Sequence, residues 1–416
     1  MAVDVESPTS PSPNSSRRQR RSTQQPASSS SSDHSTTKDG NKPTTSSFSS
    51  SVWSRNSLSS LRSSLPENPH LYDISEIRAA TNNFLAKNYS HSSSSSRSWR
   101  CNLQGKEVII FQRKLQQQLR PQNIRQKLSS ISKSHHIALV NLLGASISDD
   151  YIYLVYEFIH GANLADLLHN RNNPDFTVLN TWMSRMQIVT DLANGLDYIH
   201  HNTGLDVKFV HNHIKSTSVI VTEPSFNAKI SHFGTAELCG EPVEERETTD
   251  VIDEEEKPPK SLARSNSVKF NGTRGYMPPE LQSTGIGTRK SDVYAFGMVL
   301  LELLSGEDPV KYRFNKERKE YVRISVADAA REAVDDGAGR EGTMRKWVDR
   351  RLKDSFPVEV AAKITRLALD CIHVDPDQRP DMRRVAGKIS KLYLESRVWC
   401  DRMKMPTDIT VSFGPR

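Results

Sequence analysis

Apolar side chains are sparse in the first part of the chain and periodic in the rest. Residues 1–66 are crowded with Ser, Thr, Asn, Pro and Gln. Too few apolar groups are present there to offset the entropy lost on ordering, so we predict a disordered, Ser-rich tail. The first periodic stretch, residues 71–84, predicts a short helix with Ile77 on its apolar face and Asp73 or Ser75 as its cap.

Both the strand period and the helix period follow. Glu107–Phe111 has the β-branched content of a strand, and Ile124, Leu128 and Ile131 recur at the i, i+4, i+7 spacing of a helix. The further predicted elements are two strands, Val140–Gly144 and Tyr151–Phe158, and three helices, Trp182–His201, Val358–His373 and Met382–Leu394. Residues 311–342 form a charged stretch for which we predict no element.

Composition indicates one large folded region after the tail. The chain has 416 residues, a net charge of +7 and a mean hydropathy of −0.60. Without the tail, roughly 320 residues of ordinary globular composition remain, enough for a large core. The charge is modest for this length, and we predict no nucleic-acid partner. A basic cluster at residues 17–21 is either a nuclear-import or anionic-surface signal or part of a solvated, disordered segment.

Cysteine usage and hydropathy bear on the compartment. Cys101, Cys239, Cys371 and Cys400 do not lie at metal-ligand spacing and suggest no disulfide framework, which favours a reducing compartment. We find no signal peptide and no apolar run long enough to span a membrane. We therefore expect a cytoplasmic protein. Peripheral association with the inner face of the plasma membrane stays open, through the basic cluster or palmitoylation of Cys101 or Cys400.

Several ordered motifs resemble those of protein kinases. Phe209–Ser218 resembles the catalytic loop, and Ser231–Gly234 resembles the metal-binding D-F-G. Other matching segments are Leu154–Phe158, Gly272–Glu280, Ser291–Gly306 and Asp375–Pro380. Residues 71–84 resemble the lead-in of plant receptor-like kinases, and Met405–Arg416 resembles the C-termini of LysM-type receptor-like kinases.

The resemblance implies an α+β, two-lobed protein-kinase-like fold. It places the kinase-like domain at residues 67–398, after the tail at 1–66 and before a C-terminal tail at 399–416. A small antiparallel-sheet lobe with the αC helix would cover about 72–158, and a large, mainly helical lobe about 159–398. An activation-segment insert is expected at about 238–270.

The resemblance also implies that the catalytic positions are changed. His213 stands at the position of the catalytic aspartate, Ser218 at that of a Mg²⁺-binding asparagine and His232 at that of the D-F-G aspartate. Phe111 replaces the phosphate-pairing lysine, and Lys127 replaces its glutamate partner. A run of serines at 92–96 stands where a glycine-rich loop is expected. Lys215 survives from the catalytic loop. Lys114 is a candidate stand-in for the missing lysine, although an odd offset on a strand directs it to the opposite face.

The former nucleotide pocket would be lined by Ile109, Phe111, Tyr156 and Ile220, and two of these positions carry added apolar bulk. Histidine and serine are poor Mg²⁺ ligands. We therefore predict no cofactor, with ATP and Mg²⁺ bound only if the chain retains activity. A Zn²⁺ site between His213 and His232 is an alternative with too few ligands.

Positions that hold a kinase fold together are present. The resemblance implies a stack of His211, Phe233, Ile131 and Leu143 linking the lobes. It also implies that Asp292 holds the backbone around His211 and that Glu280 pairs with Arg379.

Three functions remain open at this point. The leading hypothesis is a catalytically degenerate kinase (pseudokinase) that acts as a signalling scaffold or allosteric partner of active receptor-like kinases. The alternative is a serine/threonine kinase with residual ATP binding or atypical activity. The third is an adaptor that works through its Ser-rich tail. Ser265 and Ser267, downstream of Arg264, are candidate phosphosites.

Overall fold

The computed structural model describes residues 69–89, 97–116, 121–170, 178–206, 208–223, 225–243, 275–315, 319–335 and 340–403. Several predictions lie outside the described residues: the Ser-rich tail at 1–66, the serine run at 92–96, the C-terminal residues after 403, and Ser265 and Ser267 with most of the activation-segment insert.

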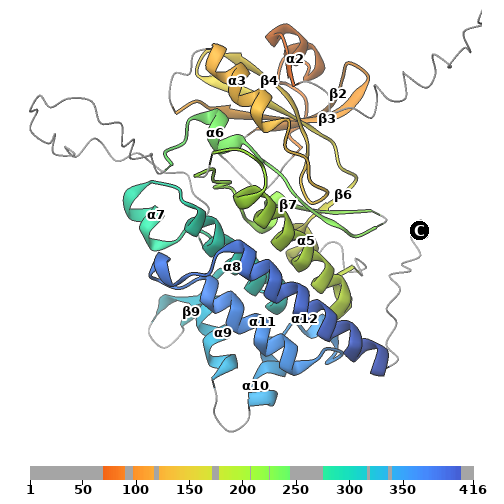
Figure 1. Cartoon of the computed structure of the whole chain (residues 1–416), viewed down its shortest axis with the longest axis vertical. Coiled ribbons are helices and arrows are strands. Elements are labelled where there is room, and N and C mark those ends of the chain that lie inside the picture. Colours follow the sequence, from red (N-terminus) through yellow and green to blue (C-terminus); the bar gives the residue numbers. More distant parts are fainter. Residues whose placement is uncertain are drawn as a thin grey trace, which may run out of the picture. The chain divides into compact units, whose positions relative to one another are not determined.

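The first lobe is a five-stranded sheet in the order β1-β4-β5-β3-β2 (Figure 1). Its strands are β1 (His70–Leu71), β2 (Ser98–Leu103), β3 (Lys106–Lys114), β4 (Leu142–Ser148) and β5 (Tyr151–Glu157). β1 pairs with β4 in parallel and the other pairs are antiparallel, so the predicted antiparallel sheet has one parallel edge strand.

Alternation along β5 gives this sheet two buried faces. Ile152 and Leu154 join the main core with helix α3 (Pro121–Ile131), while Tyr153 and Val155 pack in a second cluster with helix α2 (Ile74–Ala80). α2 begins at Asp73, whose side chain accepts a hydrogen bond from the Ser75 backbone N–H in a capping box. Of the two caps that the sequence left open, the structure therefore uses Asp73.

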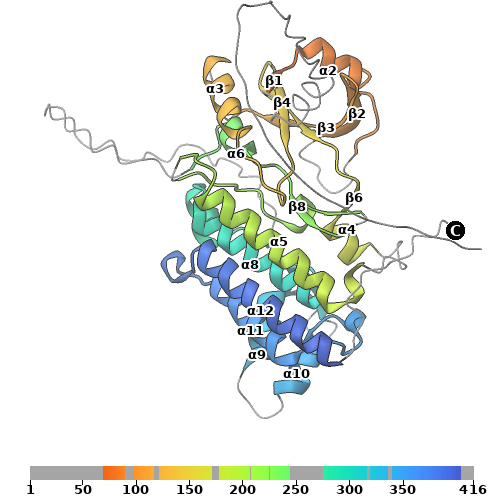
Figure 2. The same ribbon diagram turned by 45° about the vertical axis from the view of Figure 1, so that its right-hand side comes forward.

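The second lobe is mainly helical. Its longest helices are α5 (Trp182–His201), α8 (Arg289–Ser305), α11 (Val358–Cys371) and α12 (Met382–Met403). They lie alongside one another in Figure 2. The shorter helices are α4 (Leu164–His169), α6 (Thr235–Cys239), α7 (Pro279–Thr284), α9 (Val326–Val334) and α10 (Arg340–Trp347). This lobe also contains a small three-stranded sheet in the order β6 (Gly161–Asn163), β7 (Val219–Thr222), β8 (Ala228–Ile230). The predicted α+β, two-lobed architecture is confirmed.

Sequence periodicity missed some elements and boundaries. The charged stretch 311–342 contains an antiparallel hairpin, β9 (Val310–Asn315) with β10 (Glu320–Ser325), in addition to α9. β10 is exposed along nearly its whole length. Because neither of its faces is buried, its sequence does not show the alternation of apolar and polar residues that predicts a strand. Helix α12 continues to Met403, beyond the predicted helix end at Leu394.

One core prediction was wrong. Leu143 packs against the cluster around α2, and its neighbour Leu142 lies in the main core instead. A register irregularity between Leu142 and Gly144 shifts the alternation of β4 at this point. Leu143 therefore does not belong to the lobe-linking stack.

Among the described residues, no helix is both long and apolar enough to cross a membrane.

Arg379 fastens α7 to the loop before α12. Its side chain is fully buried and donates to both carboxylate oxygens of Glu280, at 2.6 and 2.9 Å, and to the backbone oxygens of Lys290 and His373. Removing one partner of such a pair leaves an uncompensated buried charge.

We expect Arg379→Ala to lower the free energy of unfolding by about 3–5 kcal/mol in urea titrations of the full chain. Arg383→Ala, on the exposed face of α12, is the matched control and should stay within about 0.5 kcal/mol of the parent. Equal stabilities of the two variants would contradict this account.

Candidate functional site

The loop at 209–218 is held by a buried carboxylate from α8. Asp292 accepts hydrogen bonds from the backbone N–H groups of His211 and Asn212, both at 2.8 Å, and lies 3.0 Å from His200 Nε2. Burial by itself would raise the pKa of Asp292, but the hydrogen bond and charge of His200 hold this pKa below its usual value. The carboxylate therefore stays ionised and fixes the loop backbone, as expected.

His211 is packed as a neutral side chain. Its Nε2 lies 3.0 Å from the Ser231 carbonyl oxygen, and its Nδ1 accepts from the His213 backbone N–H at 3.2 Å. Burial lowers the pKa of His211 to about 4. Nearby, Phe233 packs on Phe209 with ring centroids 5.4 Å apart, so the two loop segments share one core.

Gly234 explains how the D-F-G-like turn approaches α3. It has a φ of +83°, and a Cβ at this position would lie 2.7 Å from Ile131 Cγ2. Only glycine satisfies both conditions. Ile131 and Phe233 consequently belong to the same buried cluster, which links the two lobes without Leu143.

The residues at the catalytic positions bind the segment that follows the turn. His213 Nε2 lies 2.9 Å from Glu241 Oε1, and Asn212 Nδ2 donates to Glu241 Oε2 at 2.7 Å. Burial acts to raise the pKa of Glu241, but the charge and hydrogen bond of His213, together with Asn212, lower it overall. His213, predicted to stand at the position of the catalytic aspartate, therefore has its Nε2 engaged by a carboxylate of its own chain.

Lys127 makes a second such contact. Its Nζ lies 2.7 Å from Glu237 Oε1 and 3.4 Å from the Glu237 backbone oxygen. α3 thereby pairs with α6, which lies directly after the turn. Lys127, predicted to stand at the position of the kinase glutamate, thus pairs with an acid of its own chain.

Backbone and tyrosine contacts complete this arrangement. Tyr156 O–H donates to the Phe233 carbonyl oxygen at 2.8 Å, and the Gln116 backbone N–H donates to the Cys239 oxygen at 2.9 Å. Farther along, the Gly287 backbone N–H donates to Pro242 O. Residues 234–243, the segment lock, are thus fastened to both lobes.

Ser218 is turned into its own loop. Its hydroxyl donates to the backbone oxygens of His213 and Lys215, at 2.6 and 2.8 Å, and the side chain is fully buried. The hydroxyl braces the loop and does not reach toward a ligand.

A cavity of about 460 Å³ lies between the lobes. All four residues predicted for the former nucleotide pocket line it: Ile109, Phe111, Tyr156 and Ile220. Phe111 fills part of the space, with its ring 4.5 Å from that of His232 and 5.9 Å from that of Tyr156. The added apolar bulk therefore narrows the pocket but does not close it, since the volume is within the range of small-molecule sites.

Sequence reasoning missed Arg113. It lies two residues after Phe111 on β3, so both side chains fall on the face toward the cavity, which Arg113 also lines. Lys114, the candidate stand-in, is exposed. Arg113 could have been identified from the sequence, because residues two positions apart on a strand point to the same face of the sheet.

The Zn²⁺ alternative gains no further ligand. The rings of His213 and His232 lie 6.2 Å apart, and no group of three or more His, Cys, Asp or Glu side chains suited to a metal ion occurs in the part of the chain that the structure describes.

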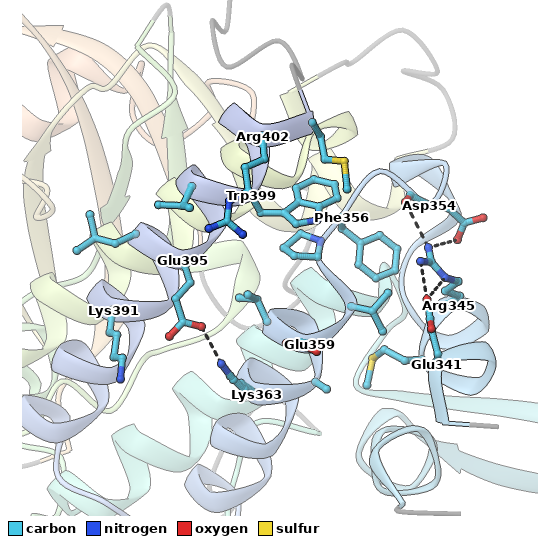
Figure 3. A pocket seen from close by; sticks show the side chains of 18 of the residues that line it. Glu341, Arg345, Asp354, Phe356, Glu359, Lys363, Lys391, Glu395, Trp399 and Arg402 are labelled. Carbon is cyan, nitrogen blue, oxygen red and sulfur yellow. Dashed lines mark hydrogen bonds and ion pairs between the residues drawn. The ribbon is translucent and has the colours of Figure 1, made fainter. Parts of the chain in front are cut away.

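A larger hollow of about 1260 Å³ lies in the helical lobe between α10, α11 and α12 (Figure 3). Phe356 and Trp399 line it, and its rim carries the Lys363–Glu395 ion pair. None of the residues at catalytic positions contributes to it, so the smaller interlobe cavity is the candidate site.

Comparison with known proteins agrees with the fold. Residues 104–388 match the protein kinase domain family. The chain is 32% identical to LysM domain receptor-like kinase 3 of Arabidopsis thaliana over 80% of this chain and 48% of the relative. It is 30% identical to PTI1-like tyrosine-protein kinase 3 of the same plant, over 78% of this chain and 72% of the relative. The chain thus spans about half the length of the LysM relative.

We expect Glu241→Ala to loosen the segment lock, because it removes the acceptor for both His213 and Asn212. Amide hydrogen exchange in residues 235–243 should become about tenfold faster or more, while the core of α8 is unchanged. Glu223→Ala, an exposed acid on the turn after β7, should leave this exchange unaltered. Unchanged protection in Glu241→Ala would show that the contact does not hold the segment.

Proposed function

The chain belongs to the protein kinase family, and we propose that it is a catalytically degenerate member, a pseudokinase that acts by binding other proteins. Phosphoryl transfer relies on positioned charges and Mg²⁺. Here histidine and serine stand at the metal-ligand positions, and Phe111 stands at the lysine position. These residues do not provide the charges that would bind Mg²⁺ and a γ-phosphate.

One observation carries the proposal above the others. At the position of the catalytic aspartate, His213 is bound to Glu241 at 2.9 Å. A catalytic base must be within hydrogen-bond reach of the hydroxyl from which it takes a proton. His213 is instead satisfied within the chain, and Asn212 reinforces the same contact. The contacts of Glu241 hold residues 234–243 beside His213, where the hydroxyl of a substrate would have to bind.

We propose active receptor-like kinases as the partners. Relatives carry names of receptor kinases, among them the chitin elicitor receptor kinase 1 of Physcomitrium patens, 30% identical over 66% of this chain and 39% of the relative. A location in the cytoplasm, with peripheral attachment at the inner face of the plasma membrane, would place the protein beside such receptors.

The alternative is a serine/threonine kinase with residual ATP binding or atypical activity. The open cavity and the survival of Lys215, which lines it, favour this alternative. A direct assay of transfer separates the two.

In that assay, the purified full chain is incubated with Mg-ATP or Mn-ATP and a peptide library containing Ser, Thr and Tyr acceptors. We expect phosphate incorporation at background level, equal to that of Lys215→Ala, because the metal ligands are missing. Incorporation that Lys215→Ala abolishes and Lys114→Ala preserves would establish the alternative function.

We further expect binding to an active LysM-type receptor kinase domain to be independent of cleft chemistry. Dissociation constants from titration calorimetry and the partner's own phosphorylation rate should be the same with the parent chain and with Lys215→Ala. An effect on the partner that disappears in Lys215→Ala would contradict a scaffold and point to catalysis.

A further inference from the structure

The β9–β10 hairpin gathers exposed apolar side chains at the margin of the second lobe, where β9 lies in Figure 1. Of the fourteen large apolar side chains that are exposed in the described part of the chain, five lie on this hairpin: Tyr312, Phe314, Tyr321, Val322 and Ile324. Tyr312 and Tyr321 are 58% and 71% exposed. A gathering of this kind on a surface is typical of an interaction site.

One face of the hairpin is aromatic with a cation at its side. Tyr321 lies opposite Phe314, and their ring centroids are 5.2 Å apart. Arg323 lies opposite Tyr312 on the same face, because partners across an antiparallel pair and residues two positions apart share a face. All four side chains are exposed.

The other face repeats this mixture with aliphatic side chains. Val322 lies opposite Arg313, and Ile324 lies opposite Lys311, which also pairs with Glu307. These strand residues are exposed as well. The hairpin therefore presents apolar and cationic groups on both of its faces.

The charge of the hairpin limits what can bind it. Residues 310–325 contain six Lys or Arg and two Glu. Like charges oppose pairing with a second copy of the same hairpin, and Lys and Arg on a two-stranded sheet also oppose the addition of another strand. The complementary partner is an anionic surface.

A lipid bilayer matches both properties of the hairpin. A docked protein covers one face of a sheet, whereas a hairpin that enters the headgroup region is surrounded on both faces. Tyrosine suits that region because its ring is apolar and its hydroxyl is polar. Each Lys or Arg close to anionic headgroups adds to the attraction.

We propose that the β9–β10 hairpin binds the surface of an anionic lipid bilayer, with Tyr312, Phe314 and Tyr321 entering the headgroup region and Arg313 and Arg323 beside the lipid phosphates. This inference rests on the peripheral membrane attachment proposed above and assigns the part of the chain that makes it. No nucleotide, metal or phosphoryl transfer takes part.

The two cysteines considered for palmitoylation support attachment less well. Cys400 is buried, and burial raises the pKa of the Cys101 thiol to about 11. Acylation needs an accessible thiolate as the nucleophile. The exposed hairpin is therefore the better-supported route to a membrane.

The test measures co-sedimentation of the full chain with vesicles of phosphatidylserine and phosphatidylcholine in equal parts, compared with phosphatidylcholine alone. Every chain carries glutamine at the four arginines of the basic cluster at residues 17–21, so that the tail adds no attraction of its own. We expect saturable binding to the anionic vesicles, and about tenfold or more weaker binding to the neutral ones. Raising the salt concentration should weaken the binding. Amide exchange of residues 310–325 should be slower in the bound state.

Two pairs of substitutions separate the contribution of charge from that of the aromatic rings. Arg313→Gln with Arg323→Gln should weaken binding to the anionic vesicles about tenfold or more. Tyr312→Ser with Tyr321→Ser should weaken it about fivefold or more, because less apolar surface enters the headgroup region. Since all four side chains are exposed, the melting temperatures should match that of the parent.

Matched controls remove the same kinds of group elsewhere on the surface. Arg383→Gln with Arg384→Gln removes two exposed cations from α12. Ile137→Ser with Leu394→Ser removes two exposed apolar side chains. Both control pairs should bind the anionic vesicles within about twofold of the parent.

Equal weakening by the hairpin pairs and the control pairs would overturn the proposal, as would binding that appears only when the arginines at 17–21 are restored. Binding of polyglutamate that Arg313→Gln with Arg323→Gln abolishes, in a chain that does not bind vesicles, would assign the hairpin to an acidic protein instead. Neither ATP nor a receptor kinase is present in this test. Its failure therefore leaves the transfer assay and the receptor titration to be decided separately.

Discussion

The buried carboxylate of Asp292 is the constraint on which the cleft depends. Taking an isolated carboxylate out of water costs several kcal/mol. Here the backbone N–H groups of His211 and Asn212 and the ring of His200 compensate that cost, all within 3.0 Å. Because two of these donors belong to the backbone, the loop keeps its shape whatever side chains it presents to the cleft. The shape of this loop therefore does not depend on which side chains it presents to the cleft.

Two of the changed side chains, Lys127 and His213, have acidic partners within the chain. A polar group buried alone would cost about 1–3 kcal/mol, so a substitution at a buried or half-buried position favours compensating contacts. Lys127 pairs with Glu237, and His213 and Asn212 share Glu241. Both acids belong to the segment that follows the D-F-G-like turn. The groups that a kinase would direct at a nucleotide therefore hold a piece of the chain itself.

Sequence reasoning predicted the elements that carry a strong period and failed where the cause was tertiary. The apolar face of α2 and the span of α5 follow from spacing alone. Leu143 was misplaced because an irregularity in β4 reverses the alternation locally. The partners of Lys127 and His213 were invisible for another reason. Glu237 is 110 residues from Lys127 in the sequence. Glu241 is the first residue of the acidic stretch 241–256, which the sequence analysis assigned to an activation-segment insert. Arg113, by contrast, could have been found from the strand period.

The segment lock and the interlobe cavity are connected through one pair of charges. Burial lowers the pKa of Arg113 and the charge of Glu241 acts in the opposite direction, while Arg113 contributes to lowering the pKa of Glu241. Glu241 belongs to the segment lock and Arg113 lines the cavity. The position of the segment therefore sets part of the electrostatic potential inside the cavity.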